Sequence, residues 1–304
     1  MQAATTLLAI FFTLLTGFVI GLFLSKKIAY FLTQLLAPLV WLLLFSIGLI
    51  FGNVLNSSAI VQRALFSAFI FAALTTFIPS ILIYSAVYFK SLRKTQCSTI
   101  HPKKTGFLKP LKECSIALGM FISGVIVVQI GPASLKNIDP HLSMKFLFVM
   151  LFIVGIEMAR IKFDRRWFSL ASWVVPLLVI IGSLTAGFIA SFITGESISV
   201  SLALASGYGW FSLSSVMLAN KLGDYYGILG LLIDLFRELA AITFLYLFGS
   251  RAPYPCIGAA GATAFDSTLP MIKQVCEPRY LPIAFMSGLW LTVATPLLIN
   301  FFLS

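Results

Sequence analysis

The sequence predicts an all-α membrane protein that crosses the bilayer many times. The chain has 304 residues, of which 60% are hydrophobic and only 10% are charged, and its mean hydropathy is +1.02. Soluble domains contain roughly 45–50% apolar and about 25% charged residues. The apolar residues also occur in runs near the roughly 20 residues that span a bilayer core about 30 Å thick. These observations exclude a soluble cytosolic enzyme and a disordered protein.

Ten apolar segments are separated by short polar breaks such as Lys26-Lys27 and Gly195-Glu196. No stretch is long and polar enough for an independent soluble domain, so we expect one transmembrane domain over residues 1–304. The first segment lacks the basic start and cleavage site of a signal peptide and is expected to remain in the protein. The predicted segments are 4–24, 34–54, 64–89, 115–133, 142–159, 167–194, 198–219, 225–249, 257–275 and 280–303.

The basic residues predict the orientation of these segments. Sixteen Lys and Arg lie in the breaks after the odd-numbered segments, and four lie on the opposite side. The positive-inside rule places the richer side in the cytoplasm, so both termini are expected in the periplasm. The numbers of Lys and Arg on the two sides of the membrane stay the same if segments 198–219 and 257–275 are re-entrant and do not cross the bilayer. In that arrangement Lys221 and Arg251 exchange sides. Eight to ten full spans therefore remain open.

Two halves of five segments, 1–160 and 165–304, would have opposite orientations, as in inverted-repeat transporters. The fourth segment of each half carries glycines and is expected to be irregular: Gly119, Gly124 and Gly131-Pro132 in the first, Gly258, Gly261 and Pro270 in the second. The halves share no clear residue-level repeat, so ten helices without internal symmetry are the alternative. We expect interrupted helices near the midplane.

Three charged residues stand near the middle of one apolar segment: Asp234, Arg237 and Glu238. An ionised group at mid-membrane costs roughly 2.5–3.5 kcal/mol on insertion scales, so these charges need a reason. One hypothesis is an Asp234–Arg237 ion pair that helps helices associate, since residues three apart are neighbours on a helix. Glu238 then remains as a carboxylate suited to a cation or a proton. Acids at segment ends, Glu196 among them, are expected to be solvated.

The ninth segment contains a second polar cluster, Thr263, Asp266, Ser267 and Thr268, followed by Pro270. Small residues on either side would let helices approach closely, but they do not explain the carboxylate or the proline. Because an interrupted helix frees backbone groups for a ligand, we predict that Asp266 lies in a functional site.

The seventh segment contains glycines, aromatic residues and serines, with Tyr208, Trp210 and Ser212 as candidate pocket residues. An aromatic belt with glycine-mediated packing is the alternative. An aromatic face beside a carboxylate can hold an ammonium group through a cation–π interaction of about 0.5–2 kcal/mol.

Metal, cofactor and enzyme chemistry are not predicted. The four cysteines have no CxxC spacing, and His101 and His141 lie in or beside loops away from the acids. No nucleophile or zinc-protease motif is present. The excess of Lys and Arg lies in short loops, which is typical of membrane orientation, so no nucleic-acid partner is expected.

Taken in order, Ala-Ser-Gly-Tyr-Gly-Trp-Phe-Ser, Asp-Leu-Phe-Arg-Glu-Leu and Gly-Ala-Thr-Ala-Phe-Asp-Ser-Thr-Leu-Pro resemble the LysO-type lysine exporter family of bacterial inner membranes. The resemblance is strongest over 198–304. It implies export of L-lysine and toxic lysine analogues, coupled to inward proton movement, with intramembrane acids essential. Glu238 and Asp266 match the positions for that role, and Asp234 and Arg237 also fit the family pattern.

The resulting hypothesis is a proton/lysine antiporter whose partners are L-lysine, protons and membrane lipid. Glu238 and Asp266 would pair with the ammonium groups of lysine, and Arg237 or N–H groups at a helix break would meet its carboxylate. A sodium/proton antiporter using the same carboxylates is the alternative, and a non-transporting sensor stays open. The sequence also leaves the oligomeric state open, a homodimer included.

Overall fold

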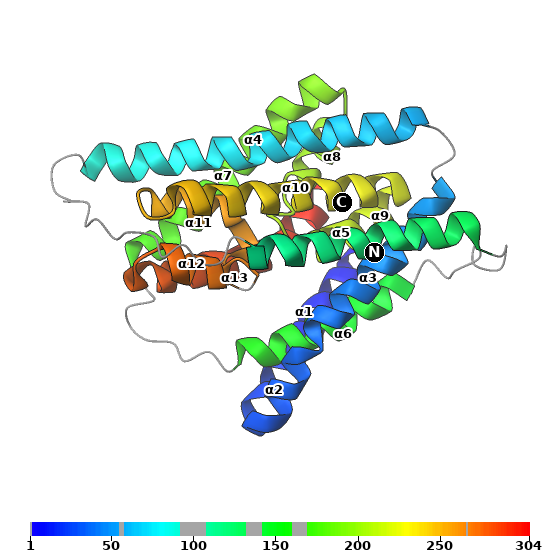
Figure 1. Ribbon diagram of the computed structural model, residues 1–304, viewed down its shortest axis with the longest axis horizontal. Coiled ribbons are helices and arrows are strands. Elements are labelled where there is room, and N and C mark those ends of the chain that lie inside the picture. Colours follow the sequence, from blue (N-terminus) through cyan, green and yellow to red (C-terminus); the bar gives the residue numbers. More distant parts are fainter. Residues whose placement is uncertain (1, 55–57, 92–107, 132–141, 160–168, 266) are drawn as a thin grey trace.

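The computed structural model describes residues 2–54, 58–91, 108–131, 142–159, 169–265 and 267–304, and every regular element in these ranges is a helix (Figure 1). The all-α fold predicted from the sequence is confirmed. The elements are α1 (Gln2–Phe23), α2 (Lys26–Gln34), α3 (Leu36–Val54), α4 (Ser58–Ser91), α5 (Leu108–Ile130), α6 (Leu142–Met158), α7 (Leu170–Thr194), α8 (Ile198–Leu204), α9 (Phe211–Leu222), α10 (Asp224–Phe248), α11 (Pro253–Ala260), the 3₁₀ turn η3 (Gly261–Phe265), α12 (Leu269–Val275), the 3₁₀ turn η4 (Pro278–Tyr280) and α13 (Leu281–Phe302).

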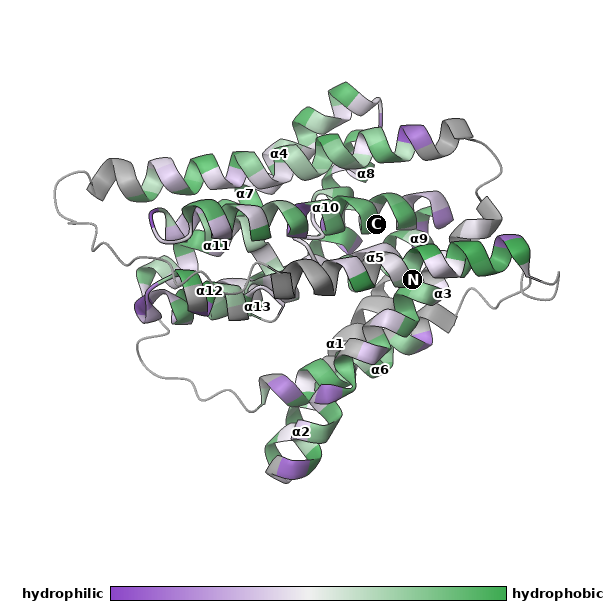
Figure 2. Ribbon diagram, viewed as in Figure 1, coloured by the Kyte–Doolittle hydropathy of each residue, from purple (hydrophilic) through white to green (hydrophobic). Residues whose placement is uncertain are grey.

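Three helical stretches in the described part of the chain are long and apolar enough to cross a membrane: Gln62–Val87, Leu170–Thr194 and Pro278–Phe302. Figure 2 shows apolar residues along the long helices and hydrophilic ones mainly near helix ends. Large apolar side chains such as Phe69, Ile81 and Phe192 are exposed on these helices. Such a surface fits lipid rather than water.

The predicted irregularity of the fourth segment is wrong at Gly119 and Gly124, whereas Pro132 lies outside the described residues. Helix α5 runs without a break through Gly119 and Gly124. Gly124 instead allows α5 to approach α3, because a Cβ at this position would lie 2.3 Å from the carbonyl oxygen of Phe45 and 3.0 Å from Cα of Gly48. Glycines at this contact let two helix backbones pack closely, as small residues commonly do in membrane helices.

This contact predicts different effects on stability for two glycine-to-alanine substitutions in α5. Gly124→Ala forces α3 and α5 apart and is expected to destabilise the protein by about 1–3 kcal/mol, the usual cost of overpacking. Gly119→Ala is the matched control, because a Cβ at Gly119 meets nothing within 4 Å. Thermal unfolding of the purified variants in detergent measures the difference. Equal midpoints for the two variants would contradict the described α3–α5 packing.

Interrupted helices are present in the second half of the chain. Helix α8 ends at Leu204 and α9 begins at Phe211, with Tyr208 (φ 51°) and Gly209 (φ 90°) in left-handed conformations between them. Helix α11 ends at Ala260, and Gly261 (φ 65°) turns the chain into η3 before α12. We call residues 205–210 the first break, and residues 261–265 together with 267–268 the second break. Glycine adopts positive φ without steric cost, which explains its presence in both breaks.

In each interrupted segment, a residue before the first short helix contacts a residue after the second short helix. Before α8, Glu196 accepts a hydrogen bond of 2.9 Å from the Tyr226 hydroxyl, which lies after α9. Before α11, the Gly249 carbonyl accepts a bond of 3.3 Å from the Cys276 thiol, which lies after α12. We therefore call α8–α9 the first hairpin and α11–α12 the second hairpin.

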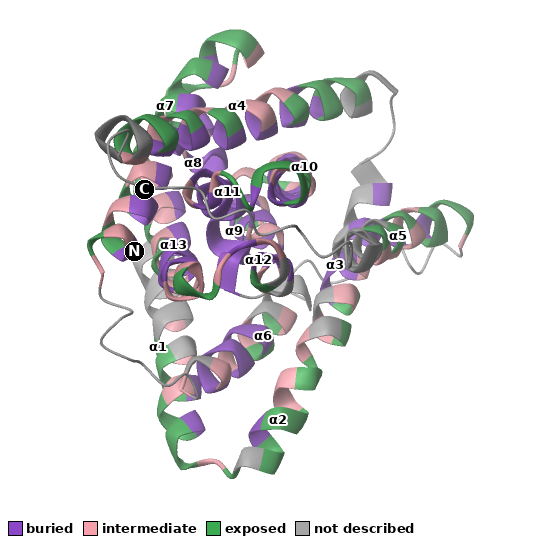
Figure 3. Ribbon diagram, turned by 60° about the vertical axis from the view of Figure 1, so that its left-hand side comes forward, coloured by how far each residue is buried: buried purple, intermediate pink, exposed green. Residues whose placement is uncertain are grey.

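The two hairpins lie in the interior of the helical assembly. Figure 3 shows buried residues gathered in α8, α9, α11 and α13, while α4 and α7 carry exposed residues on their outer faces. Trp210 packs against both hydrophobic clusters of the core. The breaks meet there, since the Ala262 amide donates to the Tyr208 carbonyl at 2.9 Å.

Candidate functional site

Helix α10 carries the three predicted charges into the interior of the protein. The exposed fractions of Asp234, Arg237 and Glu238 are 1%, 1% and 5%. Their spacing of three and four residues places them on one side of the helix. Because buried charges are costly unless they are paired or hydrogen-bonded, the partners of each side chain indicate its role.

Asp234 faces the first break. Its Oδ1 accepts a hydrogen bond of 2.8 Å from the Gly209 amide, and its Oδ2 accepts one of 2.5 Å from the Ser214 hydroxyl. The carboxylate also lies against Gly207, where an added Cβ would be 2.0 Å from Oδ2. The absence of a side chain at Gly207 thus allows the carboxylate to reach the start of α9.

Arg237 faces the second break. Its Nε donates to the Ala259 carbonyl at 3.4 Å and its Nη2 to the Gly258 carbonyl at 3.5 Å, while Nη1 donates to the Ser183 hydroxyl of α7 at 3.2 Å. The guanidinium carbon also lies 5.7 Å from the centre of the Tyr208 ring. The cation that lies near the Tyr208 ring is therefore Arg237 of the protein itself.

The predicted Asp234–Arg237 ion pair is not formed as a direct contact. Among the residues that the structure describes, no ion pair joins these two side chains, although they lie three residues apart. Each side chain turns to a different break: Asp234 binds Gly209 and Ser214, and Arg237 binds the end of α11. Asp234 thus meets an amide and a hydroxyl that donate to it, whereas Arg237 meets carbonyl groups that accept from it.

Glu238 connects α10 with the second hairpin. Its Oε1 accepts a hydrogen bond of 2.7 Å from the Ser267 hydroxyl. Ser267 is partly exposed, whereas Glu238 is buried. Asp266, the other acid predicted for the site, lies outside the described residues. Glu238 and Ser267 are thus two predicted site residues that the structure brings into direct contact.

The other predicted site residues surround the breaks. The hydroxyl of Thr268 donates to the Thr263 carbonyl at 3.0 Å, and that of Thr263 donates to the Ala260 carbonyl at 2.9 Å, so both stabilise the second break itself. Ser212 is buried in the first turn of α9, and Trp210 is partly buried directly before it. These four side chains shape the breaks around the charges of α10.

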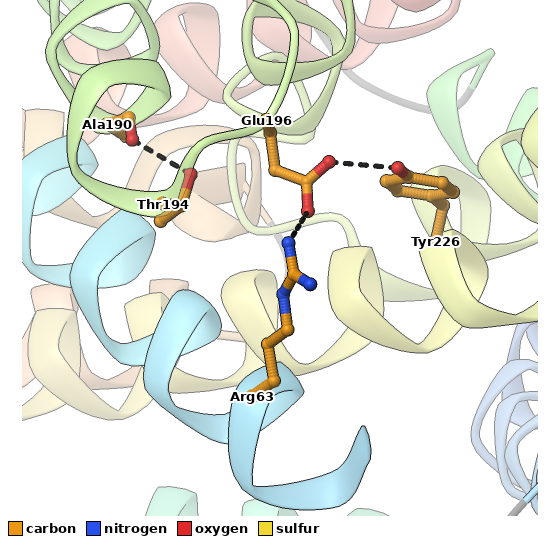
Figure 4. A network of polar contacts seen from close by, with 5 residues as sticks. All are labelled: Arg63, Ala190, Thr194, Glu196 and Tyr226. Carbon is orange, nitrogen blue, oxygen red and sulfur yellow. Dashed lines mark hydrogen bonds and ion pairs between the residues drawn. The ribbon is translucent and has the colours of Figure 1, made fainter. Parts of the chain in front are cut away.

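The expectation that water satisfies Glu196 is wrong. Its side chain is only 8% exposed, and it contacts both Tyr226 of α10 and Arg63 of α4, the latter at 3.8 Å (Figure 4). Sequence reasoning missed this contact because the three residues are far apart in the chain. The opposite signs of Arg63 and Glu196 on the same predicted side of the membrane were the only available signal.

Sequence reasoning missed Ser183, which binds Arg237. Ser214 is one of the serines of the seventh segment that predict a pocket, but its bond to Asp234 was not predicted. Serines are common in membrane helices, where their hydroxyls often bond to the preceding turn, so Ser183 does not stand out in the sequence. The glycines of the first break were visible, but their contact with a carboxylate was not.

Buried charges at the centre of one apolar helix, beside the breaks of two interrupted helices, are typical of membrane transporters. Fold and site thus define the class of the protein as a helical membrane transporter. Within this class, the chain belongs to the lysine exporter LysO family, because the family model described as "Lysine exporter LysO" matches residues 118–303. The resemblance inferred from the three motifs is confirmed.

Curated relatives agree with this assignment. The chain is 33% identical to "Lysine exporter LysO" of Escherichia coli (strain K12) over 202 residues, which are 64% of this chain and 64% of the relative. It is 33% identical over 160 residues to the "Putative lysine exporter" of Haemophilus influenzae, covering 52% of this chain and 82% of the relative. The match thus spans less than two thirds of the E. coli protein. No solved structure matches the chain.

Proposed function

We propose that this protein exports L-lysine, and toxic lysine analogues, from the cytoplasm by proton antiport across the bacterial inner membrane. The observation that carries the proposal is Glu238, a carboxylate with 5% exposure that contacts Ser267 of an interrupted helix. Lysine as the substrate is supported by the names of the relatives. Proton coupling is supported by a titratable acid inside an apolar helix.

In the proposed cycle, ionised Glu238 attracts an ammonium group of lysine from the cytoplasmic side. A proton arriving from the periplasm neutralises the carboxylate, which weakens its attraction for the cation and releases lysine outward. Loss of the proton to the cytoplasm restores the site. Asp266, which precedes the Glu238 partner Ser267 in the chain, is the proposed second carboxylate for the other ammonium group.

The proposal includes a topology of eight spans and two re-entrant hairpins. The two arms of each hairpin start and finish next to each other, as the Glu196–Tyr226 and Gly249–Cys276 contacts indicate. Helix α8 has 7 residues and α9 has 12, so neither alone reaches across a core about 30 Å thick at 1.5 Å per residue. Helix α10 has 25 residues and separates the two pairs of contacts. The hairpins therefore enter from opposite sides of the membrane.

This topology predicts the labelling of single cysteines. We expect cysteines at positions 63 and 220 to react with a membrane-impermeant maleimide in intact cells, and those at 251 and 273 only after permeabilisation. The four native cysteines are first replaced by serine or alanine. Ten full spans would instead place positions 220 and 63 on different sides of the membrane, and positions 273 and 251 on different sides as well. Labelling in that pattern would contradict the re-entrant hairpins.

Lysine export is tested by expressing the chain in a bacterial strain that lacks its own lysine exporter. We expect resistance to a toxic lysine analogue and faster efflux of labelled L-lysine than in the empty-vector strain. Unchanged efflux, despite immunodetected protein in the membrane, would contradict the proposal. In everted vesicles, a pH gradient collapsed by sodium but not by lysine would instead assign the protein to the sodium/proton antiporters.

A further inference from the structure

Asp234 is placed to hold the first break against the first turn of α9. The first N–H groups of a helix have no partner within it, and this end carries a partial positive charge. The residue before α9, Trp210, gives no side-chain cap. The carboxylate of Asp234, which comes from α10, connects the first break to the first turn of α9, because it accepts from the Gly209 amide and from the Ser214 hydroxyl.

Arg237 has the complementary position at the end of α11. The last carbonyl groups of a helix lack intrahelical partners and carry a partial negative charge. Arg237 donates to two of these carbonyls, those of Gly258 and Ala259. Its third bond, to Ser183, connects the same guanidinium to α7.

The two breaks also touch each other. The Ala262 amide of the second break bonds to the Tyr208 carbonyl of the first, and Gly261 makes this approach possible, because an added Cβ would lie 2.4 Å from that carbonyl oxygen. Arg237 lies against both, with Nη2 3.2 Å from the Cβ position of Gly261 and the guanidinium near the Tyr208 ring.

We infer that Asp234 and Arg237 are positioning residues beside Glu238: Asp234 fixes the first break to the first turn of α9, and Arg237 fixes the end of α11. The inference rests on the proposed function for its purpose, since a fixed pair of breaks defines where substrate meets Glu238. The inference changes the expected role of Arg237: its guanidinium binds the carbonyls of α11 and not the carboxylate of lysine. Asp234 likewise binds α9, through the Ser214 hydroxyl.

Hydrogen–deuterium exchange of the purified protein tests this inference without any transport assay. We expect Asp234→Asn to raise exchange of the amides around 207–215 roughly tenfold or more, and Arg237→Gln to do the same around 257–263. Thr243→Ala is the control, since Thr243 lies exposed on the same helix. Equal effects of either variant on both regions, or no effect on either, would overturn the inference.

The double variant separates positioning from ion pairing in transport. If each charge serves a different helix, Asp234→Asn with Arg237→Gln should lose about the product of the two single losses in lysine efflux. Arg237→Lys should recover only part of the loss, because one ammonium cannot match the planar fork of a guanidinium. A double variant more active or more stable than either single variant would indicate a charge pair and overturn the inference. If the wild-type protein moves no lysine, only the proposed function fails, and exchange together with melting temperatures still decides this inference.

Discussion

Glu238→Gln is expected to lower lysine movement driven by a proton gradient about 100-fold while the protein stays folded. The amide keeps an acceptor for the Ser267 hydroxyl but has no charge for an ammonium group and no titratable proton. A hydrogen bond to a charged group contributes roughly 1.5–3 kcal/mol, and each 1.4 kcal/mol corresponds to about tenfold. Efflux from proteoliposomes containing equal amounts of each variant measures the effect.

Two further variants complete this test. Thr243→Ala, on the exposed side of α10, should transport at the wild-type rate. Asp266→Asn should also lose coupling if the second proposed carboxylate takes part. Wild-type rates and wild-type dependence on the gradient in both Glu238→Gln and Asp266→Asn would exclude the proposed carboxylate mechanism.

The second large effect is expected for Gly261→Ala. The backbone at Gly261 has φ 65° and ψ −129°, a conformation essentially restricted to glycine. An added Cβ would also lie 2.4 Å from the Tyr208 carbonyl oxygen. Because two backbones cannot move apart without breaking the Ala262–Tyr208 bond, we expect a loss of about 3 kcal/mol or more in stability and little transport activity.

Gly195→Ala provides the control for backbone strain. Gly195 also has a positive φ of 74°, but a Cβ there meets nothing within 4 Å. We expect a cost near 1 kcal/mol, typical of a non-glycine residue in the left-handed region. Thermal unfolding and efflux should therefore both rank wild type, Gly195→Ala and Gly261→Ala in this order. If Gly261→Ala matched Gly195→Ala, the close approach of the two breaks would not be needed.

Much of the fold could be predicted because apolar runs of spanning length dictate helices. The predicted segment 167–194 matches α7 (Leu170–Thr194), and 280–303 matches α13 (Leu281–Phe302). The breaks within 198–219 and 257–275 were indicated by glycines, since Gly209 and Gly261 adopt conformations that other residues avoid. At Gly124 the same signal misled, because a glycine also serves close helix packing.

The candidate site could be predicted only in its composition. The cost of charge in an apolar helix identified Asp234, Arg237 and Glu238, but it does not determine the partner of each. Spacing along the helix favoured a local Asp234–Arg237 contact, whereas the structure gives each side chain hydrogen-bond partners in a different hairpin. For Glu196 the partners Arg63 and Tyr226 lie in other helices, and the opposite charges of Arg63 and Glu196 on one predicted side of the membrane do not determine how those helices pack.

The most direct test of the account is the movement of labelled L-lysine into and out of proteoliposomes that contain the purified protein and an imposed pH gradient. We predict that lysine moves against the direction of proton flow, that collapse of the gradient by an ionophore stops net movement, and that Glu238→Gln removes the gradient dependence. Lysine movement that ignores the gradient, or the absence of lysine movement in either direction, would contradict proton/lysine antiport.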